Sequence, residues 1–251
     1  MTHAKFKKYQ RREKAEISSE RIKADFVTLA SHQLRTPLSA VKWYLENVIN
    51  GKRGRITKTQ KSYLMDIYRA NERAINLVND LLDVSRIQEG LIHLELHNLK
   101  VEKVIQEVLN ELEVFIKNKK VNINFEVLKS PLPDVETDYD KLKRVLLNLI
   151  TNAIKYTPIG GSVEIVAEKV TKGINISVSD TGVGIPKAEQ KKVFRKFFRA
   201  DTAIKLAPDG TGLGLFIAKS LVEVMGGRLG FRSTEGKGST FYFNLPLKSK
   251  S

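Results

Sequence analysis

The sequence predicts two domains: an all-α helical hairpin over residues 1–89, followed by an α+β sandwich over residues 90–251. In the first domain, apolar residues recur at alternating spacings of three and four, the pattern of helices that pack along other helices. In the second, short runs that alternate between apolar and polar residues indicate strands, and they are interspersed with helical patterns. The period changes at Gln88-Glu89-Gly90, which is where we place the boundary.

The first helix is expected over residues 4–50, because no glycine occurs before Gly51. His32 lies off its apolar stripe, and Arg35 and Ser39 are expected on the same outward face as His32. The helix therefore presents an imidazole to solvent, although an ordinary surface histidine is the simpler interpretation of His32 alone. The stripe consists of Val27, Ala30, Leu34, Leu38, Val41, Leu45 and Val48.

A turn is predicted at residues 51–55, and Thr57 or Thr59 can cap a second helix that ends near Ile87. Two helices joined by a short turn form an antiparallel hairpin, which has only one inner face and cannot enclose a core. We therefore expect a homodimer through residues 4–88, in which two hairpins make a four-helix bundle. An isolated coiled-coil spacer is the alternative.

The second domain is expected to contain one sheet covered on one face by helices. A cap at Asp138 or Asp140 begins a helix that ends at about Tyr156. Strands are expected at 91–96, 121–127, 162–170, 174–180, 228–233 and 239–245, and further helical patterns at 99–120 and 213–225.

Composition limits the classes of partner. The net charge of +15 would suit nucleic acid, an anionic membrane or an acidic protein. The basic residues are spread over both halves without interleaved aromatics or zinc-finger spacing, so no nucleic-acid partner is expected. The absence of cysteine excludes disulfides and thiolate metal sites. No apolar run approaches the roughly 20 residues of a membrane span, so we expect no transmembrane segment in this chain. A cytoplasmic location is expected, whether the chain stands alone or is the cytoplasmic part of a membrane-bound sensor.

The predicted helix before Tyr156 carries polar residues on one face. Asn148, Asn152 and Lys155 are three to four residues apart, and apolar residues fill the opposite face. Amide oxygens can hold Mg²⁺ and the lysine can pair with phosphate. A solvated polar face is the alternative, but asparagine is a poor helix former for such a position.

Three glycine-containing strings and one aromatic segment follow. Asp180 ends a predicted strand before Gly182 and Gly184, and its carboxylate can accept a hydrogen bond from an exocyclic amine. Residues 210–215, GTGLGL, open a helix whose N–H groups suit phosphate. Residues 236–241 turn into the last strand, and a plain hairpin explains them nearly as well. A further segment, VFRKFFR, is either a lid over a ligand or a short amphipathic core helix.

Residues 31–38, SHQLRTPL, resemble the phosphoacceptor box of sensor histidine kinases, which usually reads SHELRTPL. The later strings resemble, in order and spacing, the N, G1, F, G2 and G3 boxes of the histidine-kinase ATPase domain, which has the Bergerat fold. The resemblance covers about residues 18–246. It implies ATP-dependent autophosphorylation of His32 and phosphoryl transfer to an aspartate of a response-regulator receiver domain. It also implies ATP and Mg²⁺ as cofactors and an upstream sensor domain or partner.

The same resemblance assigns roles to individual residues. His32, Gln33 and Thr36 would be catalytic, Asn152 would ligate Mg²⁺, and Asp180 would bind the adenine amine. The full set of implied ATP-binding residues is Asn148, Asn152, Lys155, Tyr156, Asp180, Gly182, Gly184, Ile185, Lys196, Arg199, Gly210, Thr211, Gly212, Leu213, Gly214, Leu215 and Thr240.

Gln33 departs from the family pattern, which usually has glutamate there. A glutamate can accept the proton of the other ring nitrogen, whereas glutamine cannot take up a proton at neutral pH. We therefore expect slower autophosphorylation than in members with glutamate. Two alternatives stay open: a catalytically weak pseudokinase or signalling scaffold that binds ATP, and a Bergerat ATPase that leaves His32 unused.

Overall fold

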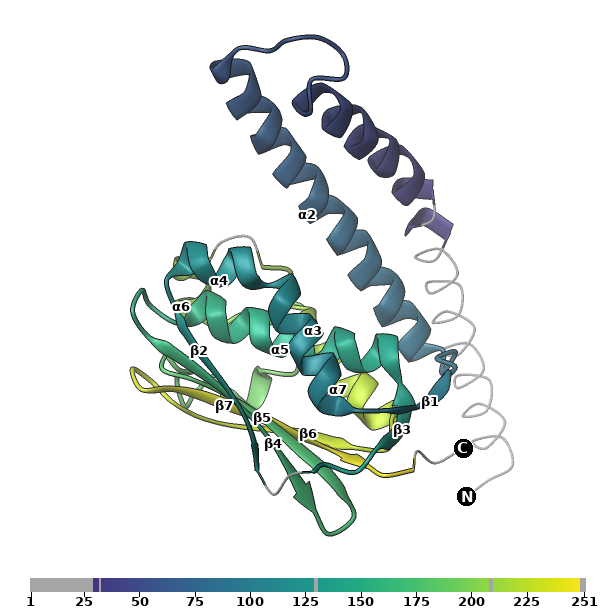
Figure 1. The fold of residues 1–251 in the computed structure, drawn as a ribbon, viewed down its shortest axis with the longest axis vertical. Helices are drawn as coiled ribbons and strands as arrows, with labels where there is room; N and C mark the ends of the chain where they lie inside the picture. The colour runs from purple at the N-terminus through teal and green to yellow at the C-terminus, as the bar shows by residue number, and fades with distance from the viewer. Residues whose placement is uncertain (1–28, 32, 129–130, 208–209, 249–251) are drawn as a thin grey trace, which may run out of the picture. The chain divides into compact units, whose positions relative to one another are not determined.

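The computed structural model describes residues 29–31, 33–128, 131–207 and 210–248 of the chain. The chain divides into two compact units, Met1–Ile92 and His93–Ser251 (Figure 1). Residues 4–28 of the helix expected over residues 4–50 lie outside the described residues, and so does His32. Within the described ranges, no helix is both long enough and apolar enough to cross a membrane.

The described part of the first unit contains two helices, one over residues 29–31 and 33–49 and the second, α2, at Lys58–Gln88. Thr57 rather than Thr59 caps α2. Its Oγ1 accepts from the backbone N–H of Gln60 at 3.2 Å, and the Gln60 side chain accepts from the Thr57 N–H at 2.8 Å. This reciprocal capping box satisfies two donors of the first turn and fixes the helix start. The predicted second helix is confirmed.

The expectation that Arg35 faces outward is wrong. Its Nε and Nη2 donate to Oδ1 of Asn79 on α2, at 3.2 and 2.8 Å, so Arg35 lies between the two helices. Lys42, seven residues on, pairs with Glu72 at 2.9 Å on the same side. The first helix therefore uses charged side chains, and not only apolar ones, to bind α2, which apolar periodicity could not predict.

The predicted apolar stripe of the first helix divides between two surfaces. Leu45 is buried, whereas Leu34 and Val41 are 51% and 42% exposed. On α2, Ile67 is 51% exposed as well. The hairpin of a single chain thus leaves large apolar side chains exposed to solvent.

The second unit contains a five-stranded sheet in the order β2-β4-β5-β7-β6 and a two-stranded sheet of β1 and β3. In the larger sheet β2 and β4 are parallel and the other neighbours are antiparallel. The strands are β1 (Leu96–Leu99), β2 (Asn122–Leu128), β3 (Val135–Asp138), β4 (Ser162–Val170), β5 (Gly173–Asp180), β6 (Arg228–Thr234) and β7 (Gly238–Pro246).

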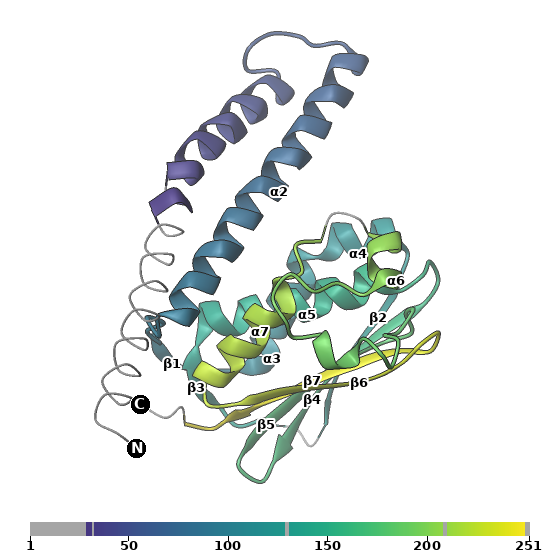
Figure 2. The same ribbon diagram turned by 180° about the vertical axis from the view of Figure 1, so that it is seen from behind.

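One face of the larger sheet is covered by helices (Figures 1 and 2). Alternate strand residues, such as Ile165, Ile176 and Phe243, are fully buried against these helices. The predicted α+β sandwich is confirmed. The helices of this unit are α3 (Val101–Glu111), α4 (Glu113–Lys119), α5 (Tyr139–Tyr156), α6 (Asp201–Leu206) and α7 (Gly214–Val224), with a 3₁₀ turn η1 (Gln190–Lys192).

Two boundaries differ from the sequence prediction. The strand expected at 91–96 is wrong, because β1 begins at Leu96, where it meets its partner β3 in the register Leu96↔Asp138. Alternation before Leu96 has no strand to pair with. The helical pattern over 99–120 is broken at Leu112, which ends α3 and begins α4. Strand β3 is only four residues long, too short for periodicity to reveal.

Candidate nucleotide site

Helix α5 positions the first set of candidate residues. The Asp138 side chain caps it by accepting from the Lys141 N–H at 3.0 Å. Asn148, Asn152 and Lys155 lie half-buried along one face. The opposite face packs into the core through Leu142, Val145, Leu146, Leu149, Ile150, Ala153 and Ile154. The amphipathic pattern therefore turns a polar face toward the rest of the site.

Asn148 contacts the start of α7. A Cβ at Gly214 would lie 2.8 Å from Oδ1 of Asn148, so only glycine lets the two helices approach this closely. The Nδ2 atom of Asn148 is buried and has no hydrogen-bond partner among the described residues. A buried donor without an acceptor costs roughly 1–3 kcal/mol, so the site favours a ligand with an acceptor oxygen here.

Asp180 lies at the end of β5, where its Oδ1 accepts the backbone N–H groups of Gly182 at 2.8 Å and Ser239 at 3.2 Å. Burial raises the pKa of the Asp180 carboxyl, and these two donors offset only part of that rise. Both donors engage Oδ1, so Oδ2 is the oxygen left to accept a hydrogen bond from a ligand.

The Gly184 turn is held against the β6–β7 hairpin. Gly184 has φ +63°, and a Cβ there would lie 2.1 Å from the Thr234 carbonyl oxygen, so a side chain is excluded. The next N–H, of Ile185, donates to Oγ of Ser233 at 2.8 Å. Farther along the sheet, the Thr240 and Ser179 hydroxyls lie 3.0 Å apart on paired strands.

Arg199 connects α5 to the glycine-rich turn. Its guanidinium is hydrogen-bonded to Tyr156: burial raises the pKa of the tyrosine, and Arg199 lowers it by less. A Cβ at Gly210 would lie 3.0 Å from Arg199 Nε. Arg199 also donates to the carbonyl of Ala203 at 3.3 Å. Lys155 Nζ lies 5.6 Å from the centre of the Tyr156 ring, completing a cationic side of the site.

The interpretation of residues 193–199 as a short core helix is wrong, because this segment forms turns between η1 and α6 and contains no helix. Phe194 packs edge-on against Phe231 of β6 at 5.6 Å. Phe197 is 61% exposed and has φ +61°, and a Cβ at Gly212 would lie 2.7 Å from its carbonyl carbon. The lid interpretation stays a prediction.

The remaining predicted residues lie in or beside the turn that leads into α7. Thr211 Oγ1 accepts from the Leu213 N–H at 3.2 Å, which orders the turn. Leu213 is fully buried and Leu215 half-buried, while the Lys196 ammonium lies 5.0 Å from the Phe216 ring.

In the first unit, Gln33 and Thr36 are exposed on the first helix. Sequence reasoning missed Ser239 and Ser233, because only the strand register, Asp180↔Ser239, brings them to the site.

The fold is a helical hairpin followed by a sheet covered on one face by helices, and the comparisons identify its class. Residues 22–90 match the His Kinase A (phospho-acceptor) domain, and residues 137–249 match the histidine kinase-, DNA gyrase B- and HSP90-like ATPase. The chain belongs to the sensor histidine kinases and comprises their transmitter region.

Individual relatives agree with this assignment. Sensor histidine kinase WalK of Bacillus subtilis is 37% identical over 96% of this chain and 39% of its own length. Full-length ShkA, solved in complex with AMPPNP, has a TM-score of 0.74 at 29% identity, over 90% of this chain and 46% of ShkA. The catalytic domain of histidine kinase ThkA is 32% identical, with a TM-score of 0.54, over 61% of this chain and 97% of that domain. The chain spans about a third of the length of the first curated relatives that it matches.

Proposed function

We propose that the protein catalyses ATP-dependent autophosphorylation of His32 and passes the phosphoryl group to an aspartate of a response-regulator receiver domain. Membership of the histidine kinases and the site around α5 support this proposal. The observation that carries it is the buried Asn148 Nδ2, which has no hydrogen-bond partner among the described residues and can donate to phosphate, together with the half-buried Asp180 carboxylate, whose Oδ1 takes both backbone donors and leaves Oδ2 to accept from adenine.

Each end of ATP finds a matching group. Oδ2 of Asp180 accepts a hydrogen bond from the exocyclic amine of adenine, and Tyr156 lines the base. At the other end, the Asn148 Nδ2, the Lys155 ammonium and the N–H groups that open α7 face phosphate oxygens. The Gly210, Gly212 and Gly214 backbone lets these phosphates approach closely.

Mg²⁺ fits the donor set of α5. It prefers oxygen ligands and usually combines one or two protein oxygens with phosphate oxygens and water. The amide oxygen of Asn152 is the protein ligand in this proposal. Bound Mg²⁺ would neutralise charge on the phosphates during transfer. No cluster of three or more His, Asp or Glu side chains offers a rival metal site among the described residues.

In the chemical step, a neutral ring nitrogen of His32 attacks the γ-phosphorus while the bond to the β,γ-bridging oxygen breaks, so ADP leaves with that electron pair. The imidazole must also lose a proton. Gln33 can orient the ring through a hydrogen bond but cannot take that proton, which therefore passes to solvent or to the product. The receiver aspartate then attacks the phosphohistidine, and the imidazole is the leaving group.

The assembly proposed for this reaction is a homodimer through residues 4–88. The exposed apolar side chains of the hairpin, including Leu34, Val41 and Ile67, support it, because a second hairpin would cover them in a four-helix bundle. A sensor domain or sensory partner upstream is proposed to control the dimer, since sensor kinases such as WalK are longer than this chain.

The test is incubation with γ-³²P-labelled ATP and Mg²⁺. The expected product is a protein-bound label that is lost in acid, survives base and is absent in His32→Ala. The pseudokinase alternative, which Gln33 favours, predicts nucleotide binding without this label. A pure ATPase predicts released phosphate that is unaffected by His32→Ala. Either result would contradict the proposed kinase.

A further inference from the structure

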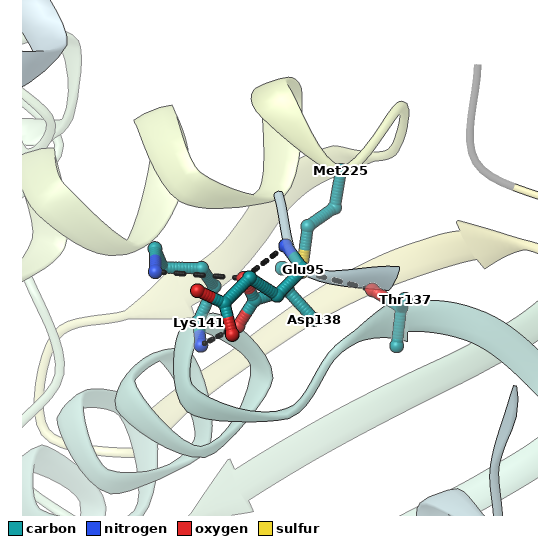
Figure 3. Close-up of polar contacts among 5 residues, drawn as sticks. All are labelled: Glu95, Thr137, Asp138, Lys141 and Met225. Carbon is teal, nitrogen blue, oxygen red and sulfur yellow. Dashed lines mark hydrogen bonds and ion pairs between the residues drawn. The ribbon is translucent and has the colours of Figure 1, made fainter. Parts of the chain in front are cut away.

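A buried carboxylate joins the segment that leaves the hairpin to the start of α5. Asp138 is 3% exposed, and its two oxygens have separate partners (Figure 3). Oδ1 accepts the Lys141 N–H in the first turn of α5 at 3.0 Å. Oδ2 accepts the Glu95 N–H, just before β1, at 2.9 Å. The Asp138 side chain, 43 residues after Glu95, thus joins the segment before β1 to the first turn of α5.

The hydrogen bond between Asp138 and the Glu95 N–H lies just beyond the end of the short β1–β3 pairing. The first residue of β1, Leu96, is already paired with Asp138, and β1 pairs only with β3 in the described sheets. The Glu95 N–H therefore has no strand to bond to beyond that pair, and the Asp138 carboxylate extends the ladder by one residue toward the hairpin. Without it, the free connection after α2 would lengthen.

The same junction touches the second helix of the nucleotide site. The Thr137 hydroxyl donates to the sulfur of Met225, the residue that ends α7, at 3.2 Å (Figure 3). Helices α5 and α7 meet again where Gly214, at the start of α7, lies against Asn148 in the middle of α5. The exit segment is therefore fastened near the beginning of α5 and the end of α7, away from the contact between Asn148 and Gly214.

We propose that Asp138 is a positioning residue for phosphoryl transfer, because it fastens the exit segment of the hairpin to the start of α5, one of the two helices of the candidate nucleotide site. This inference rests on the proposed kinase function. By shortening the free connection, the tie limits where the bound γ-phosphate can lie relative to His32. It does not itself touch ATP, so nucleotide affinity is expected to be independent of it.

Two single variants break the tie from opposite sides in the full-length chain. Asp138→Asn keeps an oxygen to cap α5 but places an NH₂ group against the Glu95 N–H. Glu95→Pro deletes that N–H and leaves Asp138 and its cap intact. Lys141→Gln is the matched control: it removes the 3.5 Å ion pair to Asp138 but neither backbone hydrogen bond.

Both single variants should lower the rate of phosphohistidine formation at saturating ATP about threefold or more, because loss of the tie frees the exit segment from α5 and the reacting groups are then held less often in the geometry that transfer requires. The Kd for ATP should stay within about twofold, a split that separates positioning from binding. The double variant should lose no more than either single variant, since both remove one interaction. Hydrogen exchange at the Glu95 amide should be faster in Asp138→Asn than in Lys141→Gln.

An unchanged transfer rate in both variants, or a rate that falls in step with ATP affinity, would overturn the inference. Melting temperatures identify a variant that fails to fold. In that case the transfer rate of the other variant tests the inference. If the unaltered chain forms no phosphohistidine, the proposed kinase function fails and this inference falls with it. If the unaltered chain is labelled while both variants match it, only the inference fails.

Discussion

The nucleotide site and the phosphoacceptor helix are built in opposite ways. Around Asp180 and Asn148, candidate residues from α5, β5, β7 and α7 contact one another and are half-buried. On the first helix, Gln33 and Thr36 are exposed, whereas Arg35 beside them binds Asn79 of α2. The nucleotide half is therefore preorganised by tertiary packing, and the other half presents its chemistry on a helix surface.

The largest effect is expected for a substitution in the preorganised nucleotide site. Asp180→Asn keeps an acceptor for the Gly182 and Ser239 N–H groups but replaces Oδ2 with a donor that opposes the adenine amine. We expect ATP affinity to fall about 100-fold, as when a buried hydrogen-bonding group is mismatched. Isothermal titration with ATP measures it, and an affinity within about threefold of the parent would contradict the assignment of Asp180.

The same variant should not lose stability at neutral pH. Burial raises the folded-state pKa of Asp180, so the native state binds more protons than the unfolded state between the two pKa values, and stability falls as pH rises through that window. Above it the buried charge is a cost that asparagine removes. Urea unfolding at pH 7 should give an Asp180→Asn chain at least as stable as the parent.

Substitutions beside His32 should change the rate of phosphohistidine formation and not the affinity for ATP. Gln33→Glu supplies a base beside His32, and we expect phosphohistidine formation to rise about tenfold, less than the roughly 100-fold or more of a full general base because solvent can already take the proton in the parent. The Kd for ATP should not change. Gln33→Ala is the control, and an equal rise in both variants would show that the carboxylate is not the cause.

Close packing between α5 and α7 gives the next effect. Gly214→Ala places a methyl group 2.8 Å from Asn148 Oδ1, and we expect ATP affinity to fall about tenfold through the displaced amide. Adding Asn148→Ala provides space for the methyl group, so the two losses should not be additive. Additive losses in a titration series would place the two residues in separate sites.

Lowering the pH should remove the stability that the ionised Asp138 carboxylate contributes. Burial alone would raise the pKa of Asp138, but the Lys141 and Glu95 N–H groups and the Lys141 ammonium outweigh it, so the net pKa is lowered. Its stabilisation is thus full above the unfolded-state pKa and is lost as pH falls through the folded-state value. Asp138→Ser should remove about 1 kcal/mol at pH 7 and flatten this acid dependence, measured by urea unfolding from pH 7 to pH 3.

The smallest expected effect is in the hairpin. Arg35→Leu removes two hydrogen bonds to Asn79, and we expect a loss of about 1 kcal/mol in stability, since hydrogen bonds from a charged donor on a half-buried surface are individually modest. ATP affinity should be unchanged. Arg86→Leu, at an exposed position of α2, is the matched control in the same denaturation experiment.

Sequence reasoning succeeded where a single helix or strand determines the outcome. Periodicity placed α2 and α5 almost to the residue, and it placed Asn148, Asn152 and Lys155 on one face. It failed where tertiary pairing decides: Arg35 turned inward because Asn79 accepts its hydrogen bonds, and β1 starts at Leu96 because β3 pairs there.

Within the nucleotide site the same division holds. Asp180 and the glycines were predictable because a carboxylate and flexible backbone at a strand end are local features. The N–H of Ser239 and the hydroxyl of Ser233 were not, because a register across strands brings them to Asp180 and Ile185. The Asn148 Nδ2 is a candidate ligand donor because it is buried next to α7 without an acceptor, and a local sequence pattern cannot predict that burial.

The most direct test of the account combines both halves in one assay, γ-³²P labelling of the full chain beside His32→Ala and Asp180→Asn. If ATP bound at Asp180 phosphorylates His32, the parent carries an acid-labile, base-stable label. His32→Ala then carries no label although ATP still binds, and a folded Asp180→Asn chain carries a strongly reduced label. A label that persists in His32→Ala, or that is indifferent to Asp180→Asn, would contradict it.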